Sequence, residues 1–129
     1  GLPRPTQQNP YGGVACGYLI VFENGFTVYH AGSTPAMADQ ALWAELYRPH
    51  LAILHLGANH APHDFAMQVR LLQTKNPNLA MVMPHHLRVS PGAGQTNFAE
   101  AQALMDYMQL GIAITMPQLG QVYQFMPGA

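Results

Sequence analysis

The sequence predicts an α/β fold in which a mixed sheet packs against about three helices. Two observations predict this fold class. Short, continuous apolar runs alternate with longer segments of helical character, an order typical of buried strands in α/β proteins. Hydrophobic residues make up 49% of the 129 residues, which is enough to bury the core of one domain.

The chain is expected to begin its fold with a β-hairpin. An apolar run over residues 14–22 is followed by the turn Glu23-Asn24-Gly25, and Asn-Gly is a strong signal for a hairpin turn. The second strand is therefore expected over residues 26–30.

A helix, a strand and a second helix are expected next. The first helix is predicted over about residues 36–47, with Ser33 or Thr34 as its N-cap, because hydroxyl side chains favour that position. Residues 50–56 form a short apolar run ended by a glycine, which predicts a buried strand. The second helix is expected over residues 63–75.

The remaining elements continue the alternation. A continuous apolar strand is predicted over residues 79–83 and is expected to stop at Pro84. Asn97 is predicted to cap a helix over residues 98–110. Two last short strands are expected over residues 112–116 and 121–125.

Charged residues are scarce and shape the expected partners. They make up 9% of the chain, against about 25% in an average protein. With a net charge of −1 and scattered basic residues, no patch is available to neutralise phosphates, so nucleic acid is excluded as a partner. A surface this poor in charge predicts coverage by another chain, and we expect a higher oligomer.

The amino-terminal segment and the hydropathy pattern bear on location. Residues 1–13 are predicted to be an extended arm or linker before a domain over residues 14–129, and they do not resemble a signal peptide. No apolar run reaches the length of about 18 residues that a spanning helix needs. We therefore expect a cytoplasmic protein with no membrane span.

Histidines gather where the predicted strands end. In an open α/β sheet the carboxyl ends of the strands share one edge, where ligands bind. Convergence at this edge is therefore predicted for His30, His60, His63, His85 and His86. A lone histidine is usually a surface or satisfied core residue, and of two neighbours in extended chain one faces away.

Other polar residues are expected to be structural. His50 lies at a strand start and His55 within a strand. Asp64, the one acid that follows a loop at this edge, is expected to be a first-turn acid favoured by the helix dipole.

Residues 29–34 read Tyr-His-Ala-Gly-Ser-Thr, and an apolar strand at residues 49–57 and the motif Pro84-His85-His86 follow. This order of motifs resembles the metallo-β-lactamase superfamily, in the branch of metal-dependent hydrolases related to ascorbate-6-phosphate lactonase. That branch reads Tyr-His-Ala-Gly-Asp-Thr at the first motif and Pro-x-His at the last, and the match runs from about Gly17 to Phe125.

The resemblance implies half of a fold. The superfamily's main signature, His-x-His-x-Asp-His, belongs to the first half of its αββα sandwich and does not occur here. The chain thus resembles the carboxyl-terminal half, and we expect a second polypeptide to carry the amino-terminal half. Processing of a longer precursor, a gene for one half, and a duplicated half remain open as origins.

The resemblance also implies a metal and an activity. It makes His86 a metal ligand, and it places Ser33 where the family has an aspartate that bridges two metals. Because a hydroxyl brings no charge to hold two cations, a mononuclear or partly lost site is expected, with Zn, or alternatively Mn or Fe. The implied reaction is hydrolysis of an ester, lactone, amide or related bond of a small molecule by metal-activated water.

Roles follow for the other polar residues at the predicted edge. His30 and His60 are predicted to be catalytic. Substrate binding is predicted for Ser33, His63 and His85. The alternative is a non-catalytic structural or binding subunit whose metal site has degenerated, with Ser33 as the trace of that loss.

Overall fold

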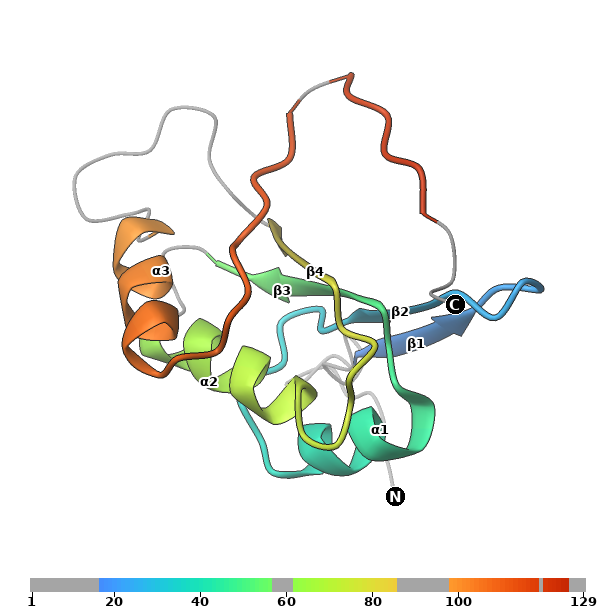
Figure 1. Ribbon diagram of the computed structural model, residues 1–129, viewed down its shortest axis with the longest axis horizontal. Helices are drawn as coiled ribbons and strands as arrows, with labels where there is room; N and C mark the ends of the chain where they lie inside the picture. The colour runs from blue at the N-terminus through green and yellow to red at the C-terminus, as the bar shows by residue number, and fades with distance from the viewer. Residues whose placement is uncertain (1–16, 57–61, 86–97, 119, 126–129) are drawn as a thin grey trace, which may run out of the picture.

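A computed structural model describes residues 17–56, 62–85, 98–118 and 120–125. Its strands form one four-stranded sheet in the order β1-β2-β3-β4 (Figure 1). The first pair is antiparallel and the other two pairs are parallel. The strands are β1 (Tyr18–Val21), β2 (Thr27–His30), β3 (Leu51–His55) and β4 (Met81–His85).

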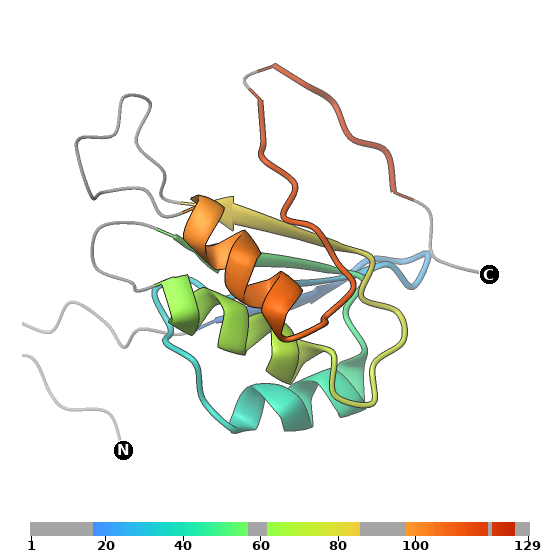
Figure 2. The same cartoon turned by 60° about the vertical axis from the view of Figure 1, so that its left-hand side comes forward.

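Three helices alternate with the parallel strands and lie on one face of the sheet, α2 between α1 and α3 (Figures 1 and 2). They are α1 (Asp39–Tyr47), α2 (Pro62–Leu72) and α3 (Phe98–Tyr107). The predicted α/β class, with a mixed sheet and about three helices, is therefore confirmed.

The hairpin between β1 and β2 forms as predicted. Gly25 has φ +87°, a left-handed conformation that an Asn-Gly turn provides at little steric cost. The Asn24 side chain accepts a hydrogen bond from the Phe26 N–H at 3.0 Å, which closes the turn. Register then pairs Tyr18 with His30.

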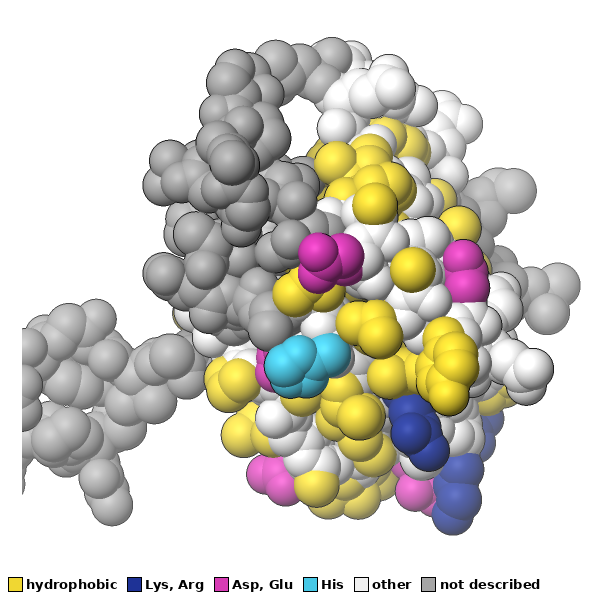
Figure 3. Space-filling view, turned by 90° about the vertical axis from the view of Figure 1, so that its left-hand side faces the viewer, with side chains coloured by type: hydrophobic (Ala, Val, Ile, Leu, Met, Phe, Trp, Pro, Cys, Tyr) yellow, Lys and Arg dark blue, Asp and Glu magenta, His cyan; other side chains and the backbone are white. Residues whose placement is uncertain are grey.

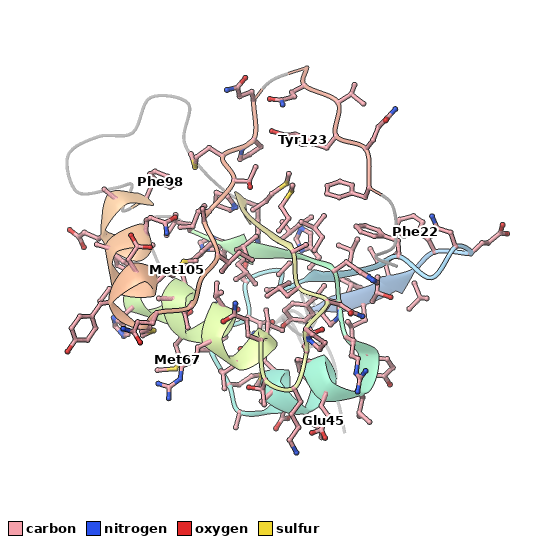
Figure 4. The ribbon with its side chains drawn as sticks, viewed as in Figure 1. Phe22, Glu45, Met67, Phe98, Met105 and Tyr123 are labelled. Atoms are coloured by element: carbon pink, nitrogen blue, oxygen red, sulfur yellow. The ribbon has the colours of Figure 1, made fainter. Side chains whose placement is uncertain are left out.

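The core lies between the sheet and the helices. Side chains on successive strand residues point to opposite faces, so Tyr29 enters this core while its neighbour Val28 faces away from the helices. Phe65 from α2 and Met105 from α3 are completely buried in the same cluster as Val82 of β4. Figure 4 shows Met105 among the side chains of this layer.

Within the described ranges no helix covers the opposite face of the sheet, and that face is apolar. Phe26, Val28 and Leu51 form a second cluster there, and Phe125 stacks on Phe26 with ring centroids 5.0 Å apart. An open hollow of about 800 Å³ lies over this face. It is lined by Ile20, Phe22, Glu23, Asn24, Phe26, Val28, Leu51, Ile53 and Phe125.

Charge is sparse on the surface, as the composition requires. Figure 3 shows apolar side chains spread over much of one face, with acidic and basic side chains at isolated places. In the described part of the chain, no helix has the length and apolar character needed to cross a bilayer.

The first helix begins three residues later than predicted. Its N-cap is Ala38, which makes no side-chain hydrogen bond, so neither Ser33 nor Thr34 caps it. The backbone before the helix is held by other side chains instead. Asp64 accepts a hydrogen bond from the Ala36 N–H at 3.0 Å.

Pro84 does not end its strand. β4 extends to His85 because its outer edge pairs only briefly, through a bridge between Val82 and Ile114, and the missing N–H of a proline costs little at an edge.

The predicted carboxyl-terminal strands were wrong. The bridge at Ile114 is all that forms of the strand over residues 112–116, and residues 121–125 form none. Instead, the segment after α3 arcs away from the sheet, with Tyr123 in the arc, and returns toward the hairpin that carries Phe22 (Figure 4). The arm predicted over residues 1–13 lies outside the described residues.

Candidate functional site

Each of the three parallel strands ends in a histidine. His30 ends β2, His55 ends β3 and His85 ends β4. The rings of His30 and His85 lie 4.6 Å apart between centroids, and the rings of His55 and His85 lie 5.3 Å apart at nearly right angles. We call these three residues the histidine cluster. The predicted meeting of His30 and His85 at the carboxyl edge of the sheet is confirmed.

Gly32 braces two members of the cluster through its backbone. Its N–H donates to Nδ1 of His30 at 3.0 Å, and its carbonyl oxygen lies 2.8 Å from Nε2 of His85. A carbonyl can only accept, so Nε2 of His85 carries a hydrogen. Because Nδ1 of His30 accepts, the neutral ring of His30 carries its hydrogen on Nε2. One residue thus sets the tautomers of both rings.

The turn that contains Gly32 follows β2 directly. Gly32 has φ +61°, and the Thr34 N–H donates to the Ala31 carbonyl at 3.1 Å. The turn is tied to the sheet because the Ala31 N–H donates to the Ile53 carbonyl of β3. Thr34 is buried, whereas Ser33 is exposed to solvent in the turn that follows His30.

The other predicted site residues stand apart or lie outside the described residues. His63 is exposed in the first turn of α2, and no ring contact joins it to the histidine cluster within the described ranges. His60 and His86 lie outside the described residues.

His50 has the structural role expected of it. It lies at the amino edge of the sheet, where its Nδ1 accepts a hydrogen bond from the Thr27 N–H at 3.1 Å. Its ring stacks on Phe26 at 5.2 Å. These contacts join the start of β2 to the start of β3.

Sequence reasoning missed His55 as a neighbour of the candidate site. The apolar run continues to Leu56, which made His55 look like an interior strand residue, but β3 ends at His55. The side chain is only 3% exposed. The signal that would have found it is register, since parallel pairing sets His55 opposite His85.

Behind the turn lies a buried chain of polar side chains, which we call the polar chain. Gln40 Nε2 donates to the Tyr29 hydroxyl oxygen at 3.0 Å and to Gln68 Oε1 at 2.8 Å. Gln68 Nε2 donates to Asp64 Oδ2 at 2.9 Å. Asp64 does lie in the first turn of α2, as predicted, but it also bonds across to the loop before α1. Both glutamines are completely buried, and the sequence analysis did not single them out.

Burial sets the ionisation of Tyr29. Desolvation raises the pKa of its hydroxyl above the usual 10.0, and the hydrogen bond from Gln40 opposes this only in part. Tyr29 therefore stays neutral at physiological pH and acts as a hydrogen-bond partner.

The described residues alone do not fit a metal ion. Within the described ranges, no group of three or more His, Cys, Asp or Glu side chains is arranged to hold one. For His30 the Gly32 N–H contributes to this, because it occupies the lone pair of Nδ1 and leaves the hydrogen of the neutral ring on Nε2. A metal bound at this edge would need ligands from elsewhere.

No family model matches the chain. It is similar to several proteins named UPF0173 metal-dependent hydrolase. The protein of this name from Koribacter versatilis is 40% identical over 83 residues, which are 63% of this chain and 34% of the relative. Its counterpart from Cupriavidus necator is 34% identical over 117 residues, 89% of this chain and 38% of the relative.

A third relative extends the same pattern. The UPF0173 metal-dependent hydrolase of Herpetosiphon aurantiacus is 31% identical over 117 residues, 89% of this chain and 46% of the relative. The chain thus spans between a third and a half of the length of these relatives. Over that part of their length it is a homologue of proteins named UPF0173 metal-dependent hydrolase.

Proposed function

We propose that this chain is part of a metal-dependent hydrolase that cleaves an ester, lactone, amide or related bond of a small molecule. The observation that carries the proposal is the histidine cluster at the carboxyl edge of the sheet, where α/β proteins place their ligands. The names of the relatives support metal-dependent hydrolysis.

Among the described residues, His30 is the proposed catalytic residue, as a hydrogen-bond donor that stabilises developing charge on the substrate. Its Nδ1 is occupied by the Gly32 N–H, so Nε2–H is the group left for a substrate oxygen. Ser33, exposed in the next turn, is a proposed substrate contact. His60, His63 and His85 complete the proposed set, with His60 catalytic and the other two contacting substrate.

The metal is proposed to bind through His86 together with ligands outside this sequence. Three ligands are the usual minimum that a protein supplies to a catalytic metal, so His86 alone would not complete the site. Ser33 stands where a bridging carboxylate is expected, so we propose one divalent ion, zinc or alternatively manganese or iron.

The helix-free face is the proposed binding surface for the other half of the fold. We propose that a polypeptide carrying the amino-terminal half of the fold packs its own sheet on the apolar hollow. The length of the relatives supports this occupant, because they extend far beyond the part that this chain matches. The chemistry of the hollow supports it as well, since Val28, Leu51 and Ile53 offer a sheet only apolar contacts.

Metal analysis of the full protein, isolated with any chain that accompanies it, tests the proposal. We expect at least one tightly held Zn, Mn or Fe per complete domain, and hydrolysis of a panel of ester and lactone substrates. His86→Ala should remove both. His50→Asn is the matched control, because it changes a histidine at the opposite edge and keeps an acceptor for the Thr27 N–H.

Two outcomes contradict the proposal. Unchanged metal content in the His86→Ala protein would refute the role given to His86. A metal-free, inactive protein would favour the alternative, a structural or binding subunit with a degenerate site.

A further inference from the structure

The polar chain has a fixed direction. Gln40 Oε1 accepts a hydrogen bond from the Met37 N–H at 3.1 Å, so the Gln40 amide must turn its Nε2 toward Tyr29 and Gln68. Gln68 then receives this donor on its Oε1 and must turn its own Nε2 toward Asp64. An ionised carboxylate, which only accepts, is the group that suits this end of the chain.

Both ends of this arrangement hold the loop between β2 and α1. Asp64 Oδ1 accepts from the Ala36 N–H, and Gln40 accepts from the Met37 N–H. Gly32 lies only four residues before Ala36, and Ala31 is itself tied to β3. The short segment between these anchors therefore has little freedom to shift.

We propose that Asp64, Gln68 and Gln40 are positioning residues for the candidate site. They act through the loop, and they hold Gly32 where its N–H meets His30 and its carbonyl meets His85. The importance of this for catalysis rests on the proposed function, whereas the positioning itself is measured without any activity assay.

Moving the acid from position 64 to position 68 tests the direction of the hydrogen bonds along the polar chain. In Asp64→Asn, the new amide must point a donor at either the Ala36 N–H or Gln68 Nε2. Flipping Gln68 and Gln40 only moves the conflict to the Met37 N–H. In Gln68→Glu, two carboxylates face each other across the present 2.9 Å hydrogen bond. Each single variant should raise the equilibrium constant for unfolding about tenfold or more, because buried polar groups lose their partners.

The double variant D64N/Q68E should restore the hydrogen bonds of the polar chain. The amide introduced at position 64 would donate to the carboxylate introduced at position 68, and its carbonyl would still accept from the Ala36 N–H. Gln40 would donate to the other oxygen of the new carboxylate. We expect the unfolding constant to return to within about threefold of the wild type, a coupling typical of residues in one network.

A spectroscopic readout separates positioning from mere stability. Imidazole ¹⁵N shifts report which ring nitrogen of His30 carries hydrogen, and the wild type should show hydrogen on Nε2 alone. Folded Asp64→Asn protein should lose this single tautomer, and D64N/Q68E should regain it. A residue that only stabilises the fold would leave the His30 tautomer unchanged in the folded protein.

Asp106→Asn is the matched control. Asp106 also accepts from a glutamine four residues away, at 3.0 Å from Gln102 Nε2, but the pair is exposed and an amide carbonyl replaces the carboxylate without conflict. Neither stability nor the His30 tautomer should change.

Each result decides the proposal. Rescue in D64N/Q68E together with recovery of the His30 tautomer supports it, even if a single variant fails to fold. Additive destabilisation in the double variant, or an unchanged His30 tautomer in folded Asp64→Asn protein, overturns it. If the full wild-type protein hydrolyses no substrate while D64N/Q68E still regains stability and the His30 tautomer, the positioning role stands and the proposed function is refuted.

Discussion

On one face of the sheet, three helices bury an apolar layer and a fully paired polar chain, whereas the opposite face presents apolar side chains over an open hollow of about 800 Å³. Val28 and Tyr29 show the difference within one strand. Tyr29 is 1% exposed and has its hydroxyl satisfied by Gln40, while Val28 belongs to the small cluster on the other side.

The two faces of the sheet differ in how far the described residues cover them. On the helix-covered face, the buried polar groups and apolar side chains of the described residues pack against the chain's own helices. The helix-free face offers the kind of apolar surface that proteins cover with another layer. Both faces end at the same carboxyl edge, so a partner on the open face would lie beside the histidine cluster.

The largest effect is expected on the helix-covered face. Phe65 is completely buried in α2, so Phe65→Ala should lower the free energy of unfolding by about 3–5 kcal/mol. Denaturant unfolding measures the change. Tyr107→Ala on α3, where the side chain is 87% exposed, is the control and should change stability by no more than about 0.5 kcal/mol. A loss below about 1 kcal/mol for Phe65→Ala would mean that this face is not the closed core of the protein.

A smaller effect is expected at Tyr29. Tyr29→Phe leaves one N–H of Gln40 without its buried acceptor, at a cost of about 1–3 kcal/mol at neutral pH.

The same variant has a pH signature. Burial raises the pKa of Tyr29 above 10.0, so the folded protein keeps a proton that the unfolded chain loses. This contribution to stability is present in full below about pH 10 and is lost as the pH rises through the pKa of the folded state. Unfolding measured between about pH 8 and about pH 11 should therefore show a decline that is weaker in Tyr29→Phe. Equal declines in both proteins would contradict the burial of this hydroxyl.

Much of the fold follows from local signals in the sequence. The Asn24-Gly25 turn, the apolar run of β3 and the breaks between helices predict their elements because each depends on neighbouring residues. The start of α1 was missed because its preceding loop is held by Asp64, which lies 28 positions from Ala36. The strand predicted at residues 121–125 does not form, because apolar composition alone does not supply a pairing partner.

The candidate site was predictable only in outline. Strand ends place His30 and His85 at one edge, and the structure brings them together. The role of Gly32 as a brace depends on the tertiary approach of β4, and the alignment of Gln40 with Gln68 depends on the packing of α1 on α2. No sequence spacing encodes either contact.

Methionine oxidation tests the covered state of the open face most directly. Met81 and Met83 pack against the apolar cluster of that face, Met105 is completely buried under the helices, and Met37 is 38% exposed. In the full protein isolated with its metal, limited peroxide treatment and mass spectrometry should find Met81 and Met83 oxidised as slowly as Met105, and Met37 oxidised much faster. Oxidation of Met81 and Met83 at the rate of Met37, in protein that retains metal and activity, would contradict the claim that another layer covers this face.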